Sequence, residues 1–307
     1  MRSFIILSAA LFAGCSGADV RFEHTSELPI SARGVGFIGD GDTAQVGMYG
    51  TTCAVDVASS RIGADVDFPT ESEFVSDGGW VLDEPAYAVI ADHEVHIGYP
   101  HQGWDGQVET LDVDAVQVRL TDDGVVGLLA DCGVFWGGQA RADVTEVRVS
   151  DCVGSSFAAS TDGVAAVSTG SDVVLVSEDG AITSVGVAGD LVAWDRALDV
   201  LYIAERNGSV VTGVHVDGNT LWTTPVEGRI KDLEAMGTHG AAAVMTELDS
   251  GIGQLYVIDG QSGEVNEAIR TPSAARALHA SFSGEVLSLE LDQAVHFFEV
   301  KQRDNSL

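Results

Sequence analysis

Basic residues are scarce in this sequence. Its 307 residues include 15 Lys and Arg against 47 Asp and Glu, and its only lysines are Lys231 and Lys301. Affinity for nucleic acid comes mainly from lysines and arginines that displace counterions from phosphates, so a net charge of -32 excludes nucleic acid as an expected partner. Anionic membrane surfaces are disfavoured for the same reason. Two interpretations of the acidity remain: a solvated acidic shell, which we favour, and a surface that binds divalent cations or a basic partner.

Long apolar runs and linkers are missing too. The longest apolar run, residues 4–12, falls well short of the roughly 20 residues that span a bilayer as a helix. Proline occurs only six times, and no Pro-rich or Ser-rich stretch divides the chain. With 45% hydrophobic residues there is ample material for a core. We therefore expect one large domain, with two domains as the alternative that length alone allows.

The short apolar run lies at the N-terminus and leads to a cysteine. Arg2 supplies a positive charge ahead of it, and small residues ending in Gly14 precede Cys15. This pattern indicates an export signal cleaved between Gly14 and Cys15. Residues 12–15, Phe-Ala-Gly-Cys, resemble a bacterial lipobox, although Leu is commoner at the first position. The resemblance implies a bacterial lipoprotein with a lipidated Cys15; an ordinary secretory signal is the alternative.

These signals predict how the chain is divided. We expect residues 1–14 to be a cleaved signal peptide, residues 15–33 a lipidated tether, and residues 34–307 the folded domain. Bacterial lipoproteins that stay at the inner membrane commonly carry Asp where this chain has Ser16. The resemblance therefore implies a location in the bacterial cell envelope, at the outer membrane, with the periplasmic and surface faces both open.

Cysteine is rare, with four in the chain. If Cys15 carries lipid, the other three allow at most one intramolecular pair. Cys132 and Cys152 are the best candidates, because each follows an Asp beside a predicted strand and an oxidising envelope preserves disulfides. Cys53 would then keep a free thiol. The alternative is that all three are small buried residues; no CxxC motif suggests redox or zinc chemistry.

Short apolar strands separated by polar turns fill most of the chain. Asn207-Gly208 and Asp217-Gly218, flanked by β-branched runs, predict hairpins with type I′ turns. Units of three or four strands recur about every forty residues, a spacing typical of propeller blades. They begin near Val35, Tyr87, Val125, Val164, Leu191, Ala235 and Ala277. The fold class is therefore all-β: a single β-propeller of seven blades, each of about four antiparallel strands. A two-sheet sandwich is the second choice.

Two segments resemble a known repeat family. Residues 200–222 are similar to the repeats of pyrroloquinoline-quinone-type propellers, a quinoprotein or WD40-like class, in which a strand, a Gly turn, a second strand, an Asp, a Gly and a Trp recur in order. Residues 255–265 resemble the same unit, with Glu267 where the Trp would fall. Quinone-binding members use an adjacent Cys-Cys pair that this chain lacks, so we expect no cofactor. A propeller with a lipid anchor also resembles the scaffold subunit of the outer-membrane protein assembly machinery, although no motif matches residue by residue.

Candidate metal ligands and aromatic sites are weak. His93, His96 and His101 lie within ten residues, but a strand turns neighbouring side chains to opposite faces and the pattern is not HExxH on a helix. Acidic turns such as residues 39–43, 121–124 and 177–180 could hold Ca²⁺, yet they lack the register of an EF-hand, and hairpins explain them. Five tryptophans could line a ligand site but more often pack between blades: Trp80, Trp104, Trp136, Trp194 and Trp222.

No catalytic motif stands out in the sequence. There is no GxSxG elbow, P-loop or GxGxxG before a helix. We therefore expect a non-catalytic, lipid-anchored envelope protein whose propeller acts as a scaffold for an unidentified envelope protein. The alternative is a divalent-cation-dependent hydrolase or lactonase with a site in the central channel.

Overall fold

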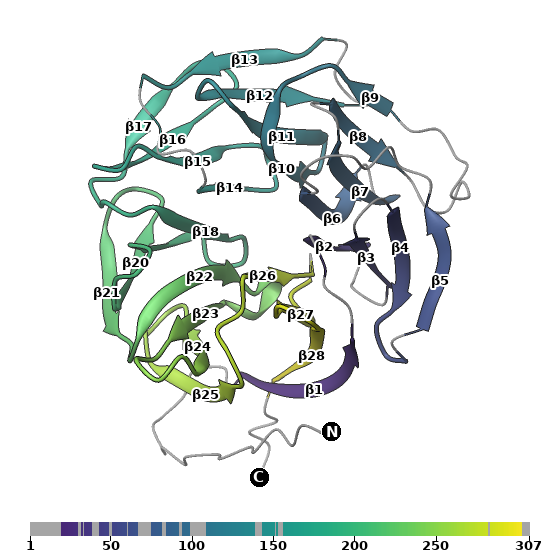
Figure 1. Cartoon of the computed structure of the whole chain (residues 1–307). Helices are drawn as coiled ribbons and strands as arrows, with labels where there is room; N and C mark the ends of the chain where they lie inside the picture. The colour runs from purple at the N-terminus through teal and green to yellow at the C-terminus, as the bar shows by residue number, and fades with distance from the viewer. Residues whose placement is uncertain are drawn as a thin grey trace.

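Seven four-stranded sheets are arranged as a ring in the computed structural model (Figure 1). The structure describes residues 20–29, 32, 34–38, 43–48, 51–59, 61–66, 75–81, 84–91, 94–98, 109–138, 143–150, 152, 156–281 and 283–302. Every strand pairing that it records is antiparallel, and six sheets keep their strands in sequence order. The predicted all-β, seven-bladed propeller is confirmed.

The first three sequential blades contain twelve strands. Their bounds are β2 (Gly34–Ile38), β3 (Thr43–Met48), β4 (Thr51–Asp56), β5 (Arg61–Val66), β6 (Val75–Val81), β7 (Glu84–Ala91), β8 (Glu94–Gly98), β9 (Glu109–Leu111), β10 (Ala115–Thr121), β11 (Gly124–Leu129), β12 (Gly133–Gly137) and β13 (Thr145–Arg148). The next three blades contain another twelve. Their bounds are β14 (Phe157–Ala159), β15 (Ala165–Ser168), β16 (Val173–Val176), β17 (Ile182–Ser184), β18 (Leu191–Asp195), β19 (Val200–Ala204), β20 (Val210–His215), β21 (Thr220–Pro225), β22 (Arg229–Ala235), β23 (Ala241–Glu247), β24 (Gly253–Asp259) and β25 (Val265–Thr271).

The seventh blade joins the two ends of the chain. It contains β26 (Ala277–Ala280), β27 (Val286–Glu290) and β28 (Val295–Gln302), and its outermost strand is the first strand of the chain, β1 (Val20–Leu28). Val20 pairs with Gln302 and Leu28 with Val295, so β1 runs along the whole of β28 (Figure 1). The first strands of neighbouring blades contact one another around the centre, from β2 to β26 and back to β2. The ring is thus closed by pairing between its two ends.

This closure corrects the predicted domain boundary. The tether of residues 15–33 was expected to precede a domain starting at residue 34, but Val20–Leu28 forms a strand of the propeller. Its burial alternates as a half-buried edge strand should: Phe22 and Leu28 are buried, whereas Arg21 and Glu23 are exposed. The sequence did not indicate that residues 20–28 belong to the propeller, because the strand they form pairs with β28 and not with a strand nearby in the sequence.

Hydrogen bonds to both neighbouring blades hold β1. The N–H of Phe22 donates to Oε2 of Glu267 on β25 at 2.6 Å, and the Ser26 hydroxyl donates to the carbonyl of Val57 after β4. On the blade itself, Nε2 of His24 lies 3.2 Å from Nδ1 of His296. Burial lowers the pKa of both imidazoles, which favours neutral rings that share one hydrogen bond.

The hydrophobic core lies in layers between neighbouring blades rather than in one central mass. Strands β12, β18 and β19 are buried along their whole lengths, as expected for strands covered on both faces. One layer joins Trp136 of β12 to Phe157 and Val167 of the next blade. Another joins Tyr202 and Trp222 to Ile230 and Val244. Each blade is therefore stable only against its neighbours.

The predicted starting points of the blades were partly wrong. Val35, Leu191 and Ala277 do lie on the innermost strands β2, β18 and β26. Tyr87 and Val125, however, lie on the second strands β7 and β11. Second strands such as β11, Gly-Val-Val-Gly-Leu-Leu, form longer apolar runs than inner strands such as β14, which has three residues. Hydrophobic runs in the sequence therefore indicate the second strands more strongly than the innermost ones.

Two tryptophans form hydrogen bonds between adjacent blades. Trp136 is fully buried, and its Nε1–H donates to the carbonyl of Gly163 in the next blade at 2.6 Å. Trp222 repeats the arrangement with Gly260 at 2.8 Å. The interpretation of these two rings as packing residues is confirmed. For Trp80 the structure describes only the backbone, on β6, and Trp104 lies outside the described residues.

The hairpin turns differ from the predicted type I′. In the β20–β21 turn, Gly218 has φ 89°, whereas Asp217 does not have positive φ. His215 and Asn219 close the turn through an N–H donated by His215 to the carbonyl of Asn219 at 2.9 Å. This is a three-residue connection with one left-handed glycine, and the acidic turn at residues 177–180 repeats it with Gly180 at φ 88°. The acidic turn after Thr121 joins β10 to β11.

A disulfide joins Cys132 to Cys152, the pair favoured by the sequence. Cys132 lies in the β11–β12 turn with φ 68°, and Cys152 follows β13, 20 residues later. Their Cα atoms are 5.6 Å apart, within the usual range for a disulfide. The bond ties one blade to the connection that leads into the next. Cys53 lies on β4, where only its backbone is described.

Within the described part of the chain, no helix has the length and apolar character needed to cross a membrane. The helical content there is a single 3-10 turn, η2 (Gly237–His239).

Phe22→Ala tests whether β1 belongs to the folded domain. Phe22 is 4% exposed and packs on Phe298 with ring centroids 6.0 Å apart. We expect the free energy of unfolding to fall by about 3–5 kcal/mol, measured by urea denaturation. Arg21→Ala, on the exposed face of the same strand, is the control and should change it by less than about 0.5 kcal/mol. Equal stability of F22A and wild type would place β1 outside the cooperative domain.

Cys132→Ser combined with Cys152→Ser tests the disulfide. Removing a bridge across 20 residues should lower the free energy of unfolding by about 3 kcal/mol, because the unfolded chain regains conformational freedom. Adding reductant should lower the thermal midpoint of the wild type and leave that of the double variant unchanged. Cys53→Ser should respond to reductant as the wild type does.

Candidate functional site

The described inner strands bring charged side chains to one end of the central channel. On β10, Val118 and Leu120 are buried, and Arg119 between them faces the channel because side chains alternate along a strand. Glu234 occupies a similar place near the end of β22. Nη2 of Arg119 lies 3.9 Å from Oε2 of Glu234, an ion pair between blades that are far apart in sequence.

A buried carboxylate positions the second arginine of this channel end. Asp195, at the end of β18, accepts the N–H groups of Ala197 at 2.9 Å and Leu198 at 3.1 Å, and the Tyr202 hydroxyl at 2.5 Å. Burial raises the pKa of Asp195, although these hydrogen bonds oppose the rise. The turn held in this way carries Arg196, whose Nη2 donates to the carbonyl of Leu120 at 3.3 Å.

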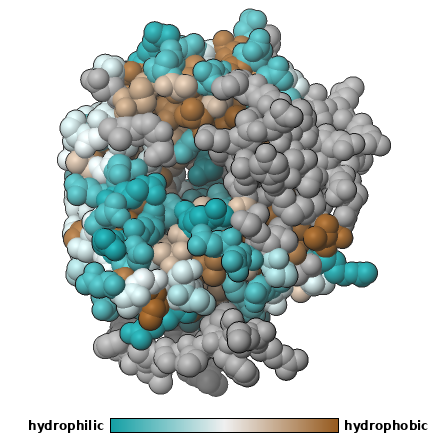
Figure 2. All heavy atoms as spheres, in the orientation of Figure 1, coloured by the Kyte–Doolittle hydropathy of each residue, from teal (hydrophilic) through white to brown (hydrophobic). Residues whose placement is uncertain are grey.

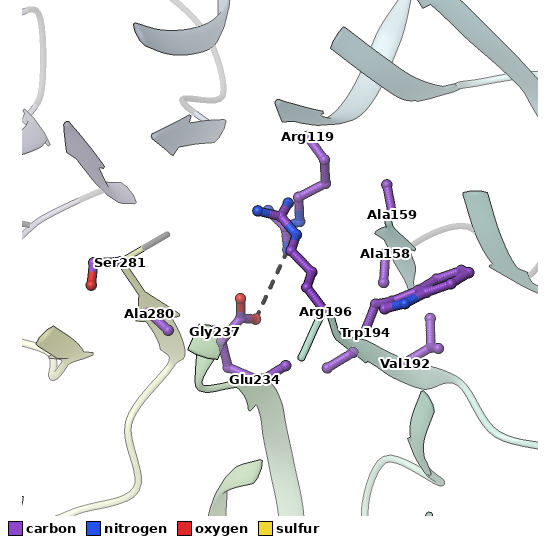
Figure 3. A pocket seen from close by; sticks show the side chains of 12 residues that line it. Arg119, Ala158, Ala159, Val192, Trp194, Arg196, Glu234, Gly237, Ala280 and Ser281 are labelled. Carbon is purple, nitrogen blue, oxygen red and sulfur yellow. Dashed lines mark ion pairs between the residues drawn. The ribbon is translucent and has the colours of Figure 1, made fainter. Parts of the chain in front are cut away.

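These side chains border a small hollow. Figure 2 shows that this face of the molecule is hollowed at its centre, with hydrophilic residues around much of the opening. In Figure 3, Arg119 and Arg196 point into the same space, and Glu234 approaches from β22. The cavity measures about 50 Å³, which leaves room for a few water molecules. Residues of five blades line it: Arg119, Ala158, Ala159, Val192, Ala193, Trp194, Arg196, Glu234, Ala235, Gly237, Ala280 and Ser281.

A second charged group lies beside the hollow, on β22, β26 and β27. Nε2 of His279 lies 3.2 Å from Oε1 of Glu290, which is almost fully buried. Burial would lower the pKa of His279, but the Glu290 carboxylate, with Glu234 and Asp232 farther away, raises it above the usual value. Asp232 accepts the N–H groups of Leu278 at 2.7 Å and Leu233 at 3.0 Å. Burial raises the pKa of Asp232 despite these bonds.

Of the residues singled out from the sequence, Trp194 lines the hollow, whereas His96, Cys132 and Cys152 do not. Gly14, Cys15, His93 and His101 lie outside the described residues. His96 is buried on β8, where Nδ1 lies 3.2 Å from Oγ1 of Thr110 and Nε2 lies 3.7 Å from Oε2 of Glu94. Among the residues that the structure describes, no group of three or more His, Cys, Asp or Glu could hold a metal ion.

Sequence reasoning missed the channel residues. Arg119, Arg196, Glu234 and His279 come from four different blades, and no local motif contains two of them. For Arg119 the signal that could have found it is a charged residue between two buried ones on an inner strand. Using this signal requires knowing which strand of each blade is innermost, and the units predicted to begin near Tyr87 and Val125 were placed on second strands.

Comparison with known proteins bears on the fold. No family model matches the sequence, and no curated protein matches it. Among solved structures, 1121 chains match this chain. One belongs to the structure titled "Crystal Structure of Mitotic Checkpoint Complex", with a TM-score of 0.68 at 12% sequence identity, over 97% of this chain and 98% of that chain. The chain has a WD40-like propeller fold. At this identity the likeness shows the fold alone.

His279→Gln tests the charged group beside the hollow through pH. Because the folded pKa of His279 is raised, its stabilising contribution is fully present below the unfolded value of about 6.5 and is lost as pH rises through the folded pKa. The difference in unfolding free energy between wild type and H279Q should therefore be largest near pH 5–6 and shrink toward pH 9. Glu290→Gln should flatten this trend. A constant difference across the range would contradict the assignment.

Proposed function

We propose that this protein is a non-catalytic scaffold of the bacterial cell envelope, anchored by lipid on Cys15, whose propeller docks a partner protein. The main support is the closed ring with a preformed polar hollow where five blades meet. Pairing of β1 with β28 holds that face together, so a partner meets a surface that needs little ordering on binding.

The lipid anchor is supported by the sequence and by where the fold begins. Residues 12–15 resemble a lipobox, and β1 begins at Val20, five residues after Cys15. Five residues reach at most about 17 Å when extended. A lipid on Cys15 would thus keep the rim formed by β1 close to the membrane, whose anionic surface would otherwise repel a chain of net charge -32. The outer membrane is the proposed location.

The proposed relation to pyrroloquinoline-quinone-type repeats concerns blade architecture alone. Residues 200–222 cover β19 to part of β21, and residues 255–265 cover most of β24 and the start of β25, so each resembling segment follows the strand order of a blade. The proposal assigns no quinone to the chain.

Cys15→Ser tests the anchor. We expect the wild type to fractionate with membranes and to need detergent for release, because several acyl chains are required for stable anchoring. The C15S variant should appear in the soluble envelope fraction, with mass spectrometry showing the lipid only on wild type. Cys53→Ser, which leaves the lipobox intact, should fractionate as wild type. Equal membrane association of C15S and wild type would rule out the anchor.

Crosslinking in intact cells, followed by affinity purification from native membranes, tests the scaffold. A partner crosslinked to residues around the channel end would support it, particularly if Cys15→Ser reduces the yield without unfolding the propeller. Crosslinks confined to the outer strands would contradict docking at the channel end.

A further inference from the structure

Two histidines meet at the seam that closes the ring. The seam is the antiparallel pair of β1 and β28, and within it Nε2 of His24 lies 3.2 Å from Nδ1 of His296. The ring of His24 also packs edge-on against Phe298, with centroids 5.3 Å apart. Residues 296 and 298 share one face of β28, because side chains alternate along a strand. Phe298 belongs to the core layer that includes Leu255 and Val257 of β24, so the two imidazoles lie between the last two blades.

The hydrogen bond between these rings requires that they are not both charged. A neutral imidazole has one N–H donor and one acceptor nitrogen, so two neutral rings form one hydrogen bond. When both are protonated, the pair has donors only and two like charges in contact. His296 is 7% exposed, so water does little to offset this repulsion. Double protonation therefore favours a state in which the two rings separate.

Other charged groups near the seam oppose this effect without reversing it. Glu27 lies across the strands from His296 and raises the pKa of both imidazoles, but burial is the larger influence and lowers both. Glu23, Glu299 and Lys301 form their own ion pairs, at 2.7 and 3.2 Å. The other charged residues of β1, β24, β25 and β27 are Arg21, Asp259, Glu267, Arg270 and Glu290. Burial of the rings thus remains the main influence on their protonation.

The backbone of the seam is irregular beside His24. The register shifts between His24 and Ser26, where Thr25 is an extra residue in β1. Bulges of this kind disrupt the ladder of hydrogen bonds locally. Thr25 compensates in part, because its hydroxyl oxygen accepts the N–H of Glu299 at 3.2 Å. The histidine pair therefore lies where the two strands are paired less regularly than on either side.

From this geometry we propose that the His24–His296 pair is a proton-sensitive clasp on the ring: neutral rings hold β1 on β28, and mild acid releases β1 reversibly while the other blades stay folded. The seam is the element that switches, and its closed and open states differ in whether β1 pairs with β28. The inference concerns the propeller itself and depends neither on the lipid anchor nor on a partner protein.

The direction of the pH effect follows from burial. Release of β1 would expose both rings to water, where their pKa values are near 6.5, whereas the closed seam lowers the pKa of His24 and of His296. The open state then binds protons more readily. Closure is therefore favoured above about pH 6.5 and is lost as pH falls through the lowered pKa values.

Hydrogen–deuterium exchange of the purified full chain tests the clasp. A peptide covering β1 is compared with one covering residues 191–204, which contain no histidine. Protection factors remove the direct effect of pH on the exchange chemistry. Between about pH 7.5 and pH 5.0 we expect the protection of β1 to fall at least about tenfold relative to residues 191–204, the factor that one pH unit between the closed and open pKa values produces. Return to pH 7.5 should restore it.

Substitutions assign the loss to the histidines. His24→Gln combined with His296→Gln keeps side chains that form hydrogen bonds but do not titrate, so the extra loss of protection in β1 should disappear. Glu27→Gln should deepen the loss, because it removes the carboxylate that raises the pKa of both rings. His215→Gln is the matched control and should behave as wild type, since His215 is exposed on β20 in another blade.

Two results would overturn the clasp directly. One is an equal loss of protection in β1 of the wild type and of the double histidine variant. The other is a parallel loss in β1 and in residues 191–204, which would mean that acid unfolds the whole ring. Thermal midpoints at pH 7.5 show whether the double variant is folded. If it is not, E27Q carries the comparison, and a loss no deeper than that of wild type would overturn the proposal.

Discussion

Closure of the ring is the constraint on which the rest of this structure depends. Each blade buries its faces against two neighbours, so a row of blades with free ends would expose two apolar faces. Pairing β1 with β28 removes those ends, and hydrogen bonds of Glu267 and Ser26 connect β1 to the blades on either side. The imidazoles of His24 and His296 meet within the blade itself. The geometry of the channel, including the distance between Arg119 and Glu234, follows from that closure.

Much of the fold could be predicted from the sequence because its signals are local. Apolar runs and Gly-containing turns recur at blade spacing, and the cysteine contexts indicated the Cys132–Cys152 pair. The boundary at β1 could not be found in this way, since the strand with which β1 pairs, β28, lies about 270 residues later in the sequence. The channel site escaped for a related reason: Arg119, Arg196 and Glu234 become neighbours only when blades curve around a common centre.

Carboxylates have different roles at the surface of the protein and near the channel. At the surface, carboxylates are mostly solvated and pair with the few lysines and arginines, as Glu247 does with Lys231 at 2.8 Å. Such exposed pairs contribute little to stability. Near the channel, Asp195 and Asp232 are held by backbone N–H groups, and their pKa values are raised by burial. There, Asp195 shapes the turn that carries Arg196, and Asp232 connects β22 to β26.

Pairing of the first strand with the last also bears on how such a chain is made. Of the described strands, β1 leaves the ribosome first and its partner β28 leaves last, so a growing chain lacks the native partner of β1 until β28 has been made. Long-range pairing of this kind is slow compared with local hairpins. The topology itself therefore delays completion of the native ring until β28 is available.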